Sequence, residues 1–144
     1  MVKLGLVGGV DIFHGIAFSA LLNEIDKEAW AEAKYWNPNV PPLENASITA
    51  IWDPKPGVAE RRAKLLQGVE LLPQRMEDMI GQVDGVLLAD DVTQRHQKRA
   101  FAFIEAGVPT FCDKPLSRDP QEAEEIVKLV RVTEAKFMSS SALG

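Results

Sequence analysis

Short apolar runs alternate along the chain with longer segments in which apolar residues recur every three or four positions. The apolar runs predict β-strands at 2–8, 47–53, 69–72, 83–89, 108–112 and 136–138. The helical spacing predicts helices at 13–29, 58–67, 94–106 and 120–133, with a further short helix around 76–80. Continuously apolar strands are typical of parallel sheets covered on both faces. The pattern therefore predicts a doubly wound, three-layer α/β/α domain with right-handed crossovers.

Turn and cap residues agree with these boundaries. Gly107 follows the 94–106 segment and can take the left-handed conformation that ends a helix. Asp119 is a good N-cap for the 120–133 helix, with Pro120 at its first position. The stretch 36–46 contains three prolines and predicts an extended loop.

Composition narrows the class of protein. The chain has 144 residues, enough for one domain, and a net charge of -5 without a basic patch, so nucleic-acid binding is not expected. The clusters Arg61-Arg62-Lys64 and 95–99 are interpreted as solvated helix faces. No apolar run approaches the roughly 20 residues needed to cross a bilayer, so no membrane contact is expected. The single cysteine, Cys112, is predicted to be buried and reduced, which favours the cytoplasm.

The first strand ends in a glycine turn that opens a helix. Gly8 and Gly9 precede Val10-Asp11-Ile12, and free N–H groups at such a helix terminus attract a pyrophosphate. The spacing departs from G-x-G-x-x-G: Val10 is expected to hold the pyrophosphate farther off, Phe13 to push the helix from the strand, and Asp11 to add negative charge. The alternative is a glycine turn that binds no ligand.

An acidic residue follows the second strand. A carboxylate at the position of Asp53 can accept both ribose hydroxyls of an adenosine and repels a 2′-phosphate, so NAD is favoured over NADP. Lys55 lies close enough to complicate this preference. The alternative is that Asp53 only starts the turn before Pro54.

The segment 83–116 contains the most informative motifs. Ala89 ends a strand, His96 lies on the next helix, Glu105-Ala106-Gly107 ends that helix, and Lys114-Pro115 follows the next strand. This order resembles the glucose–fructose oxidoreductase / inositol dehydrogenase (Gfo/Idh/MocA) family, and the resemblance extends over essentially the whole chain. It implies a Rossmann-like NAD(P)-binding domain of an oxidoreductase that transfers hydride between NAD(P) and a sugar, cyclitol or similar hydroxylated metabolite.

The resemblance also implies roles for individual residues. Lys114 would lie beside the nicotinamide and the reacting carbinol, where its ammonium polarises the substrate hydroxyl. Pro115 would fix the turn, with a cis bond as one way of doing so. The expected cofactor contacts are Gly8, Gly9, Val10, Asp11, Ile12, Asp53, Ala89, Asp90, Asp113 and Lys114.

Some positions depart from the family pattern. Asp113 stands where glutamate is usual, and Asp90-Asp91 replace Thr-Pro. This acidic pair could cap a helix or bind a polyol or a cation, but no third ligand is placed to make a metal site. His14 and His96 are interpreted as helix residues that hold loops.

The family pattern also predicts the domain organisation. Residues 1–138 are expected to form the dinucleotide-binding domain and 139–144 to begin a linker to an absent C-terminal substrate domain. The full-length protein is expected to be a homo-oligomer, and this chain alone to be inactive. Two alternatives stay open: a stand-alone, non-catalytic NAD(P)-binding or redox-sensing module, and a flavodoxin-like domain that binds no nucleotide.

Overall fold

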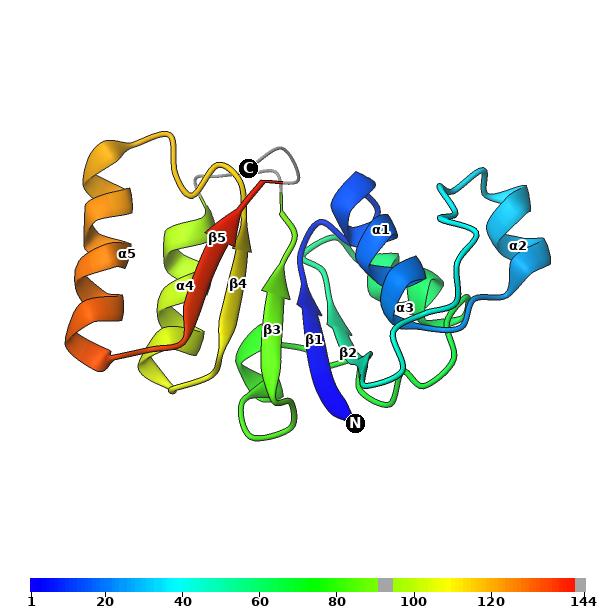
Figure 1. The fold of residues 1–144 in the computed structure, drawn as a ribbon, viewed down its shortest axis with the longest axis horizontal. Helices are drawn as coiled ribbons and strands as arrows, with labels where there is room; N and C mark the ends of the chain where they lie inside the picture. Colours follow the sequence, from blue (N-terminus) through cyan, green and yellow to red (C-terminus); the bar gives the residue numbers. More distant parts are fainter. Residues whose placement is uncertain (91–94, 142–144) are drawn as a thin grey trace.

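Five parallel strands form the centre of the molecule. The computed structural model describes residues 1–90 and 95–141. The strands lie in the order β2-β1-β3-β4-β5, and every pairing between neighbours is parallel (Figure 1). Their bounds are β1 (Val2–Val7), β2 (Ala46–Trp52), β3 (Gly85–Leu88), β4 (Thr110–Asp113) and β5 (Phe137–Ser140). The winding reverses between β1 and β3, so the predicted doubly wound sheet is confirmed.

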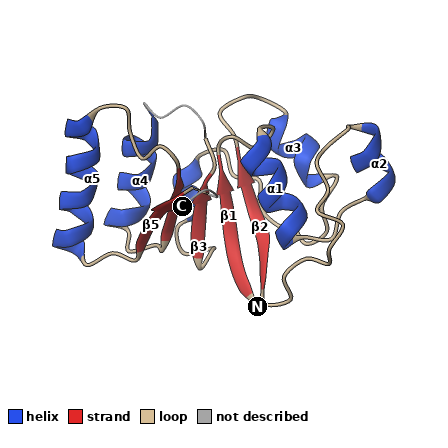
Figure 2. Cartoon of the chain, turned by 45° about the horizontal axis from the view of Figure 1, so that its top comes forward, coloured by secondary structure: helices blue, strands red, loops and turns tan. Residues whose placement is uncertain are grey.

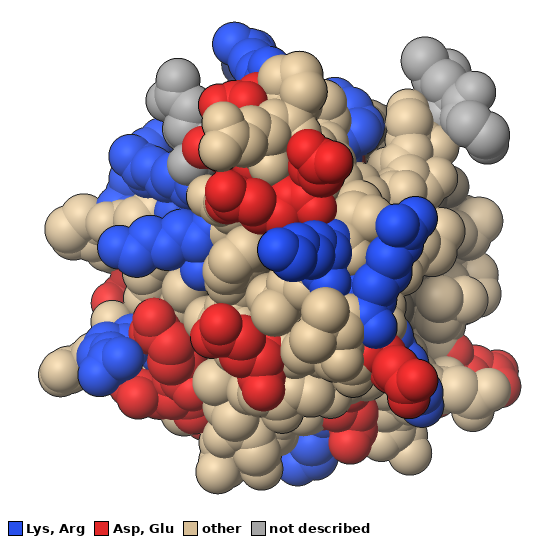
Figure 3. Space-filling view, turned by 90° about the vertical axis from the view of Figure 1, so that its left-hand side faces the viewer, with Lys and Arg blue, Asp and Glu red and all other residues tan. Residues whose placement is uncertain are grey.

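Helices lie on both sides of this sheet. Their bounds are α1 (Phe13–Leu22), α2 (Lys27–Glu32), α3 (Val58–Ala63), the 3-10 helix η1 (Met76–Met79), α4 (His96–Glu105) and α5 (Pro120–Thr133). In Figures 1 and 2, α4 and α5 lie on one side of the row of strands, and α1, α2 and α3 lie on the other. The face that carries α5 has acidic and basic side chains side by side (Figure 3).

Each face of the sheet has its own apolar core. Leu6 and Ile51 pack with Trp30 in one cluster, whereas Val7 and Leu88 pack with residues of η1, α4 and α5 in the other. Neighbouring residues of β1 therefore point to opposite faces, and both are fully buried. This double burial explains why the strands are continuously apolar in sequence.

The prediction of one continuous helix at 13–29 is wrong. The segment forms two helices, α1 and α2, with a short break between them. Asn23 causes the break, because its buried side chain bonds to other backbones. Its Nδ2 donates to the carbonyls of Ile48 (2.9 Å) and Gln67 (2.8 Å), and its Oδ1 accepts from the Ile48 N–H at 3.1 Å. Asp26 then caps α2 by accepting from the Ala29 N–H at 3.1 Å.

Two further elements are shorter than predicted. The strand at 69–72 is reduced to one isolated parallel bridge between Ala50 and Leu71. The helix at 58–67 ends at Ala63, and Leu66 forms an isolated bridge with Ile25 instead. The segment at 69–72 still borders β2, because the Glu70 and Leu71 N–H groups donate to the Thr49 carbonyl at 2.8 Å and 3.0 Å.

Several local predictions are confirmed. Gly107 has a φ of 71°, Asp119 accepts from the Gln121 N–H at 2.9 Å, and the Lys114–Pro115 bond is cis. Cys112 is a free, buried thiol, and burial, followed by the charge of Asp113, raises its pKa to about 12. Across the described part of the chain, every helix is too short or too polar to span a membrane.

Candidate functional site

The predicted site residues gather at one edge of the sheet. Because the strands are parallel, the residues that follow β1, β2, β3 and β4 all emerge at the carboxyl edge. The glycine turn, Asp53, the Ala89-Asp90 pair and Lys114 therefore lie on the same side of the molecule. The switch point between β1 and β3 brings the glycine turn next to Ala89.

The glycine turn is held closely between β3 and α1. Gly8 and Gly9 have φ values of 66° and 60°. A Cβ on Gly9 would lie 2.2 Å from the carbonyl oxygen of Ala89, and a Cβ on Gly15 would lie 2.1 Å from that of Gly9. Gly15 therefore allows α1 to pack closely against the turn. In G-x-G-x-x-G this is the role of the third glycine, which would fall at position 13 here. The sequence did not reveal this role, because Gly15 lies six positions after Gly9, outside the spacing of the motif.

The two side chains expected to disturb the turn do not do so. Val10 is fully buried and packs into the core beneath α1. Phe13 is 60% exposed, and its ring lies 5.9 Å from that of Trp36. The prediction that Phe13 pushes the helix from the strand is therefore wrong, because its ring lies at the surface, and the Val10 side chain points into the core.

Free donors surround the beginning of α1. The first helical bond runs from the Ile16 N–H to the Ile12 carbonyl at 2.9 Å, and the Ile12 N–H is used by Gly9 at 3.1 Å. Among the residues that the structure describes, the N–H groups of Phe13, His14 and Gly15 have no acceptor. Unpaired donors at a helix N-terminus form an anion site, which fits a pyrophosphate.

The charge of Asp11 is neutralised locally. Its carboxylate lies 3.3 Å from Arg61 and 3.5 Å from Arg62. Arg62 also donates to the Val10 carbonyl at 3.1 Å, and thereby ties α3 to the loop. The repulsion expected between Asp11 and a bound phosphate is therefore reduced.

The burial of Arg62 shows that the prediction of a solvated helix face is wrong for this residue. It is 1% exposed, and its guanidinium lies 4.8 Å from the Trp30 ring centroid and 4.3 Å from that of Tyr35. Burial lowers the pKa of Arg62, while Tyr35 and Asp11 oppose that shift. Two aromatic faces here replace the water that a surface arginine would have.

Asp53 supports the glycine turn. Its carboxylate accepts from the Val10 N–H at 3.1 Å and from the Lys55 N–H at 2.9 Å. Each carboxylate oxygen has a second lone pair, so further donors can still bind. A cavity of about 390 Å³ lies beside the neighbouring Trp52, with Arg75 and Lys98 in its lining.

Asp90 forms an ion pair with Arg99 of α4. Arg99 is buried, lies 5.3 Å from the Trp52 ring centroid and packs against Gly8. Burial lowers the pKa of Arg99, and the charge of Asp53 opposes that shift. The solvated-face interpretation is therefore wrong for Arg99 too. Asp91, the other half of the predicted acidic pair, lies outside the described residues.

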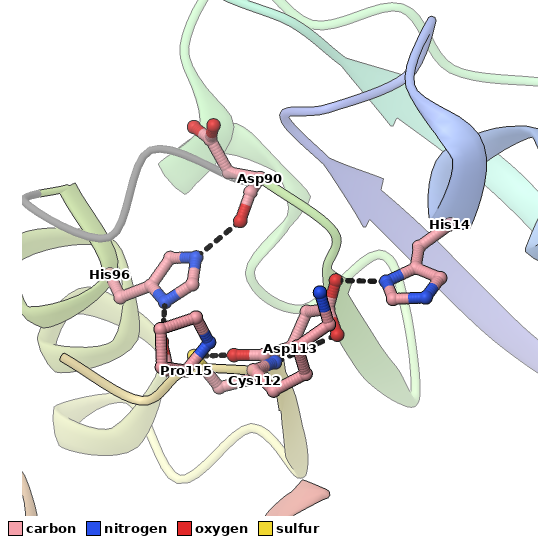
Figure 4. Close-up of polar contacts among 7 residues, drawn as sticks. His14, Asp90, His96, Cys112, Asp113 and Pro115 are labelled. Carbon is pink, nitrogen blue, oxygen red and sulfur yellow. Dashed lines mark hydrogen bonds and ion pairs between the residues drawn. The ribbon is translucent and has the colours of Figure 1, made fainter. Parts of the chain in front are cut away.

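The lysine turn follows β4 directly. Asp113 is buried; its carboxylate accepts from the Lys114 N–H at 2.7 Å and contacts Nδ1 of His14 (Figure 4). The Lys114 side chain is exposed. His14 thus connects the beginning of α1 to the lysine turn, a contact that the sequence did not reveal.

His96 joins the ends of β3 and β4. Its Nδ1 lies 3.1 Å from the Pro115 carbonyl, and its Nε2 contacts the Asp90 carbonyl (Figure 4). The ring is fully buried. The prediction that His96 holds loops is confirmed.

Known proteins share this architecture. A model of an oxidoreductase family with an NAD-binding Rossmann fold matches residues 29–141. Inositol 2-dehydrogenase 4 from Saccharopolyspora erythraea is 34% identical over 88 residues, 60% of this chain and 25% of that protein. A putative myo-inositol dehydrogenase from Sinorhizobium meliloti superposes with a TM-score of 0.70 and 25% identity, over 97% of this chain and 36% of its own. For an NAD binding oxidoreductase from Klebsiella pneumoniae, the TM-score is 0.68 and the identity 28%, over 96% of this chain and 34% of its own.

The extent of these matches decides what they establish. The match covers 25% of the length of the inositol 2-dehydrogenase from Saccharopolyspora erythraea. It therefore concerns one part of that larger enzyme. The family model, by contrast, covers most of this chain. The chain therefore belongs to the Gfo/Idh/MocA oxidoreductase family and carries its NAD-binding Rossmann fold.

Proposed function

We propose that this chain holds the dinucleotide for a dehydrogenase that oxidises a sugar, a cyclitol or a similar hydroxylated metabolite. The observation that carries the proposal is the exposed Lys114 at the carboxyl end of β4, on the same sheet edge as the glycine turn. A dinucleotide across this edge would place one end at the turn and the other near the lysine.

In this proposal the glycine turn and the ends of the strands bind different parts of the cofactor. The free N–H groups at the beginning of α1 bind the pyrophosphate. Asp53 accepts the hydroxyls of the adenosine ribose and favours NAD over NADP, and the cavity beside Trp52 accommodates the adenosine end. Ala89 and Asp90 lie along the nicotinamide half, where the β3 end approaches Gly9.

Bound NAD would supply the acceptor for a hydride. Lys114 would donate hydrogen bonds from its ammonium to the substrate oxygen and stabilise the charge that develops there. Asp113 fixes the Lys114 backbone through its 2.7 Å hydrogen bond, which limits the positions that the lysine stem can reach.

The remaining parts of the proposal concern the whole protein. We propose that residues 139–144 lead toward a substrate-binding domain and that the protein forms a homo-oligomer. An apolar groove of about 430 Å³ on the sheet, lined in part by Phe111 and Met138, supports burial against another surface. The free Cys112 thiol is consistent with a reducing compartment such as the cytoplasm.

The lysine assignment predicts a loss of chemistry without a loss of binding. Lys114→Ala in the full-length polypeptide should lower kcat with a cyclitol substrate by about 100-fold or more, because a charge-stabilising donor is removed. The dissociation constant of NAD, measured by calorimetry, should change little. An unaltered kcat would contradict the catalytic role of Lys114, whereas NAD binding without any turnover in the original protein would favour a non-catalytic binding module.

The ribose assignment predicts a change in cofactor preference. Asp53→Asn keeps one oxygen, which can accept from the Val10 N–H but not also from the Lys55 N–H, and it loses the negative charge. NAD affinity should therefore fall about tenfold, the equivalent of roughly one charge-assisted hydrogen bond. NADP should bind the variant better than it binds the original chain. Asp53→Ala, which also releases the turn, should additionally lower the Tm. Unchanged NAD affinity in both variants would refute the assignment.

A further inference from the structure

We propose that two copies of this chain associate face to face through the groove on β3, β4 and β5. The proposal rests on the homo-oligomer part of the proposed function and assigns that oligomer a surface within this chain. The groove, of about 430 Å³, has an apolar floor, with Asp84 and Lys136 among its lining residues. Its occupant is a second copy, because the lining is self-complementary in both side-chain register and charge.

The floor of the groove is a row of three apolar side chains. Strand register places Leu87 of β3 beside Phe111 of β4, and Phe111 beside Met138 of β5. Side chains alternate between the two faces of a strand, and the neighbouring Cys112 and Phe137 pack into the core with α4 and α5. The row of three therefore points to the opposite face of the sheet.

This row is only partly covered. Leu87 and Phe111 are half-buried, and Met138 is 58% exposed. The helix α1 lies toward β1 and β2 (Figure 1), and it reaches the row where Phe18 contacts Phe111 edge-on, with ring centroids 5.7 Å apart. Parallel sheets are normally covered on both faces, so this face favours burial against another apolar surface.

A two-fold axis pairs the row with itself. An axis parallel to β4 and passing above Phe111 exchanges β3 of one copy with β5 of the other. Phe111 then faces Phe111 of the second copy, and Leu87 faces Met138 of the second copy. Each sheet covers the other, and sheets that pack face to face keep their strands nearly aligned. Such a self-complementary patch is what the interface of a two-fold dimer requires.

The charges follow the same symmetry. Asp84 directly precedes β3 and Lys136 directly precedes β5, so both lie at the amino edge of the parallel sheet. Both residues are exposed and line the groove. The axis that pairs Leu87 with Met138 brings Asp84 opposite Lys136 of the second copy, and the reciprocal pair forms at the same time. The dimer thus has an apolar centre with two ion pairs at its rim.

The first test is the mass of the 144-residue chain in solution. Sedimentation equilibrium without cofactor should show a dimer with a dissociation constant in the micromolar range, typical of a small interface. Met138→Glu puts two carboxylates into the apolar centre and should weaken association by about 100-fold. Val132→Glu, a carboxylate on the exposed face of α5, should leave association unchanged. A chain that stays monomeric up to millimolar concentration would refute the proposal.

Exchange of charges tests the symmetry itself. Lys136→Glu and Asp84→Lys each place like charges opposite one another, so each variant alone should dimerise about tenfold more weakly. An equimolar mixture restores both opposite-charge pairs in a heterodimer and should associate within about threefold of the original chain. The Lys3 N–H donates to Asp84 at 2.7 Å, so Asp84→Ala, which loses this bond without gaining a charge, is the matched control and should give no such recovery. A mixture that associates no better than its components would contradict the pairing.

Cofactor binding separates this inference from the proposed function. The groove borders the amino ends of the strands, whereas the dinucleotide is proposed at the carboxyl edge, so the NAD dissociation constant of each variant should stay within about twofold of the original. Absence of NAD binding in the original chain would refute the proposed function and leave the dimer standing. Met138→Glu could instead lower the Tm of the full-length polypeptide without changing its mass. The groove would then be covered within one chain, and the inference would be overturned while the proposed function stands.

Discussion

Gly9→Ala should lower the free energy of unfolding by about 2–4 kcal/mol and abolish measurable NAD binding. The φ of 60° alone costs an alanine about 1–2 kcal/mol. The added Cβ would also lie 2.2 Å from the Ala89 carbonyl oxygen, and overpacking of this kind costs about 1–3 kcal/mol. Because both sides of the contact are backbone, the turn must move away from β3, and the donors at the beginning of α1 move with it.

Variants of two other glycines distinguish the cost of a positive φ from the cost of the steric contact. Gly107 has a φ of 71°, but a Cβ added there would meet none of the described atoms within 4 Å, so Gly107→Ala should cost only about 1 kcal/mol. Gly15 has no positive φ, yet its Cβ would lie 2.1 Å from the Gly9 carbonyl oxygen. Gly15→Ala should therefore weaken NAD binding through sterics alone. Equal urea midpoints for Gly9→Ala and Gly107→Ala would show that the contact with Ala89 is unimportant.

The fold could be predicted because it follows from local patterns. The continuous apolar runs that became β1 and β3 are buried on both faces, and Gly107 and Asp119 mark helix boundaries by their own backbone chemistry. Lys114 could be placed for the same reason, since the carboxyl end of a parallel strand is defined by the strand itself. The break at Asn23 could not, because it depends on the Ile48 and Gln67 backbones, which are distant in sequence.

The candidate site was harder to predict where charged groups are buried. Arg62 and Arg99 occupy helical positions that are usually solvated, so their burial was not predicted. Trp30 and Tyr35 lie before strand β2 and Arg62 lies after it, whereas Asp90 follows β3 and pairs with Arg99 of the next helix. The pair formed by His14 and Asp113 is separated by 99 positions. Such contacts arise only after the sheet brings the strand ends together.

Arg62→Ala should destabilise the protein by about 3–4 kcal/mol and loosen the glycine turn. The change removes the side chain packed between Trp30 and Tyr35, and a large buried side chain replaced by alanine typically costs this much. It also removes the donor to the Val10 carbonyl and a partner of Asp11. Chemical denaturation measures the first effect, and calorimetry with NAD measures the second.

Arg62→Met distinguishes packing from charge. Methionine fills much of the space between the two aromatic rings but donates to neither Val10 nor Asp11. Two arginine nitrogens, Nε and Nη1, are buried without a hydrogen-bond partner among the described residues, so part of the cost of burying the charge disappears in this variant. Arg62→Met should therefore regain most of the stability lost in Arg62→Ala, yet bind NAD as weakly as that variant. Recovery of NAD affinity together with stability would mean that Arg62 acts on the turn only by filling space.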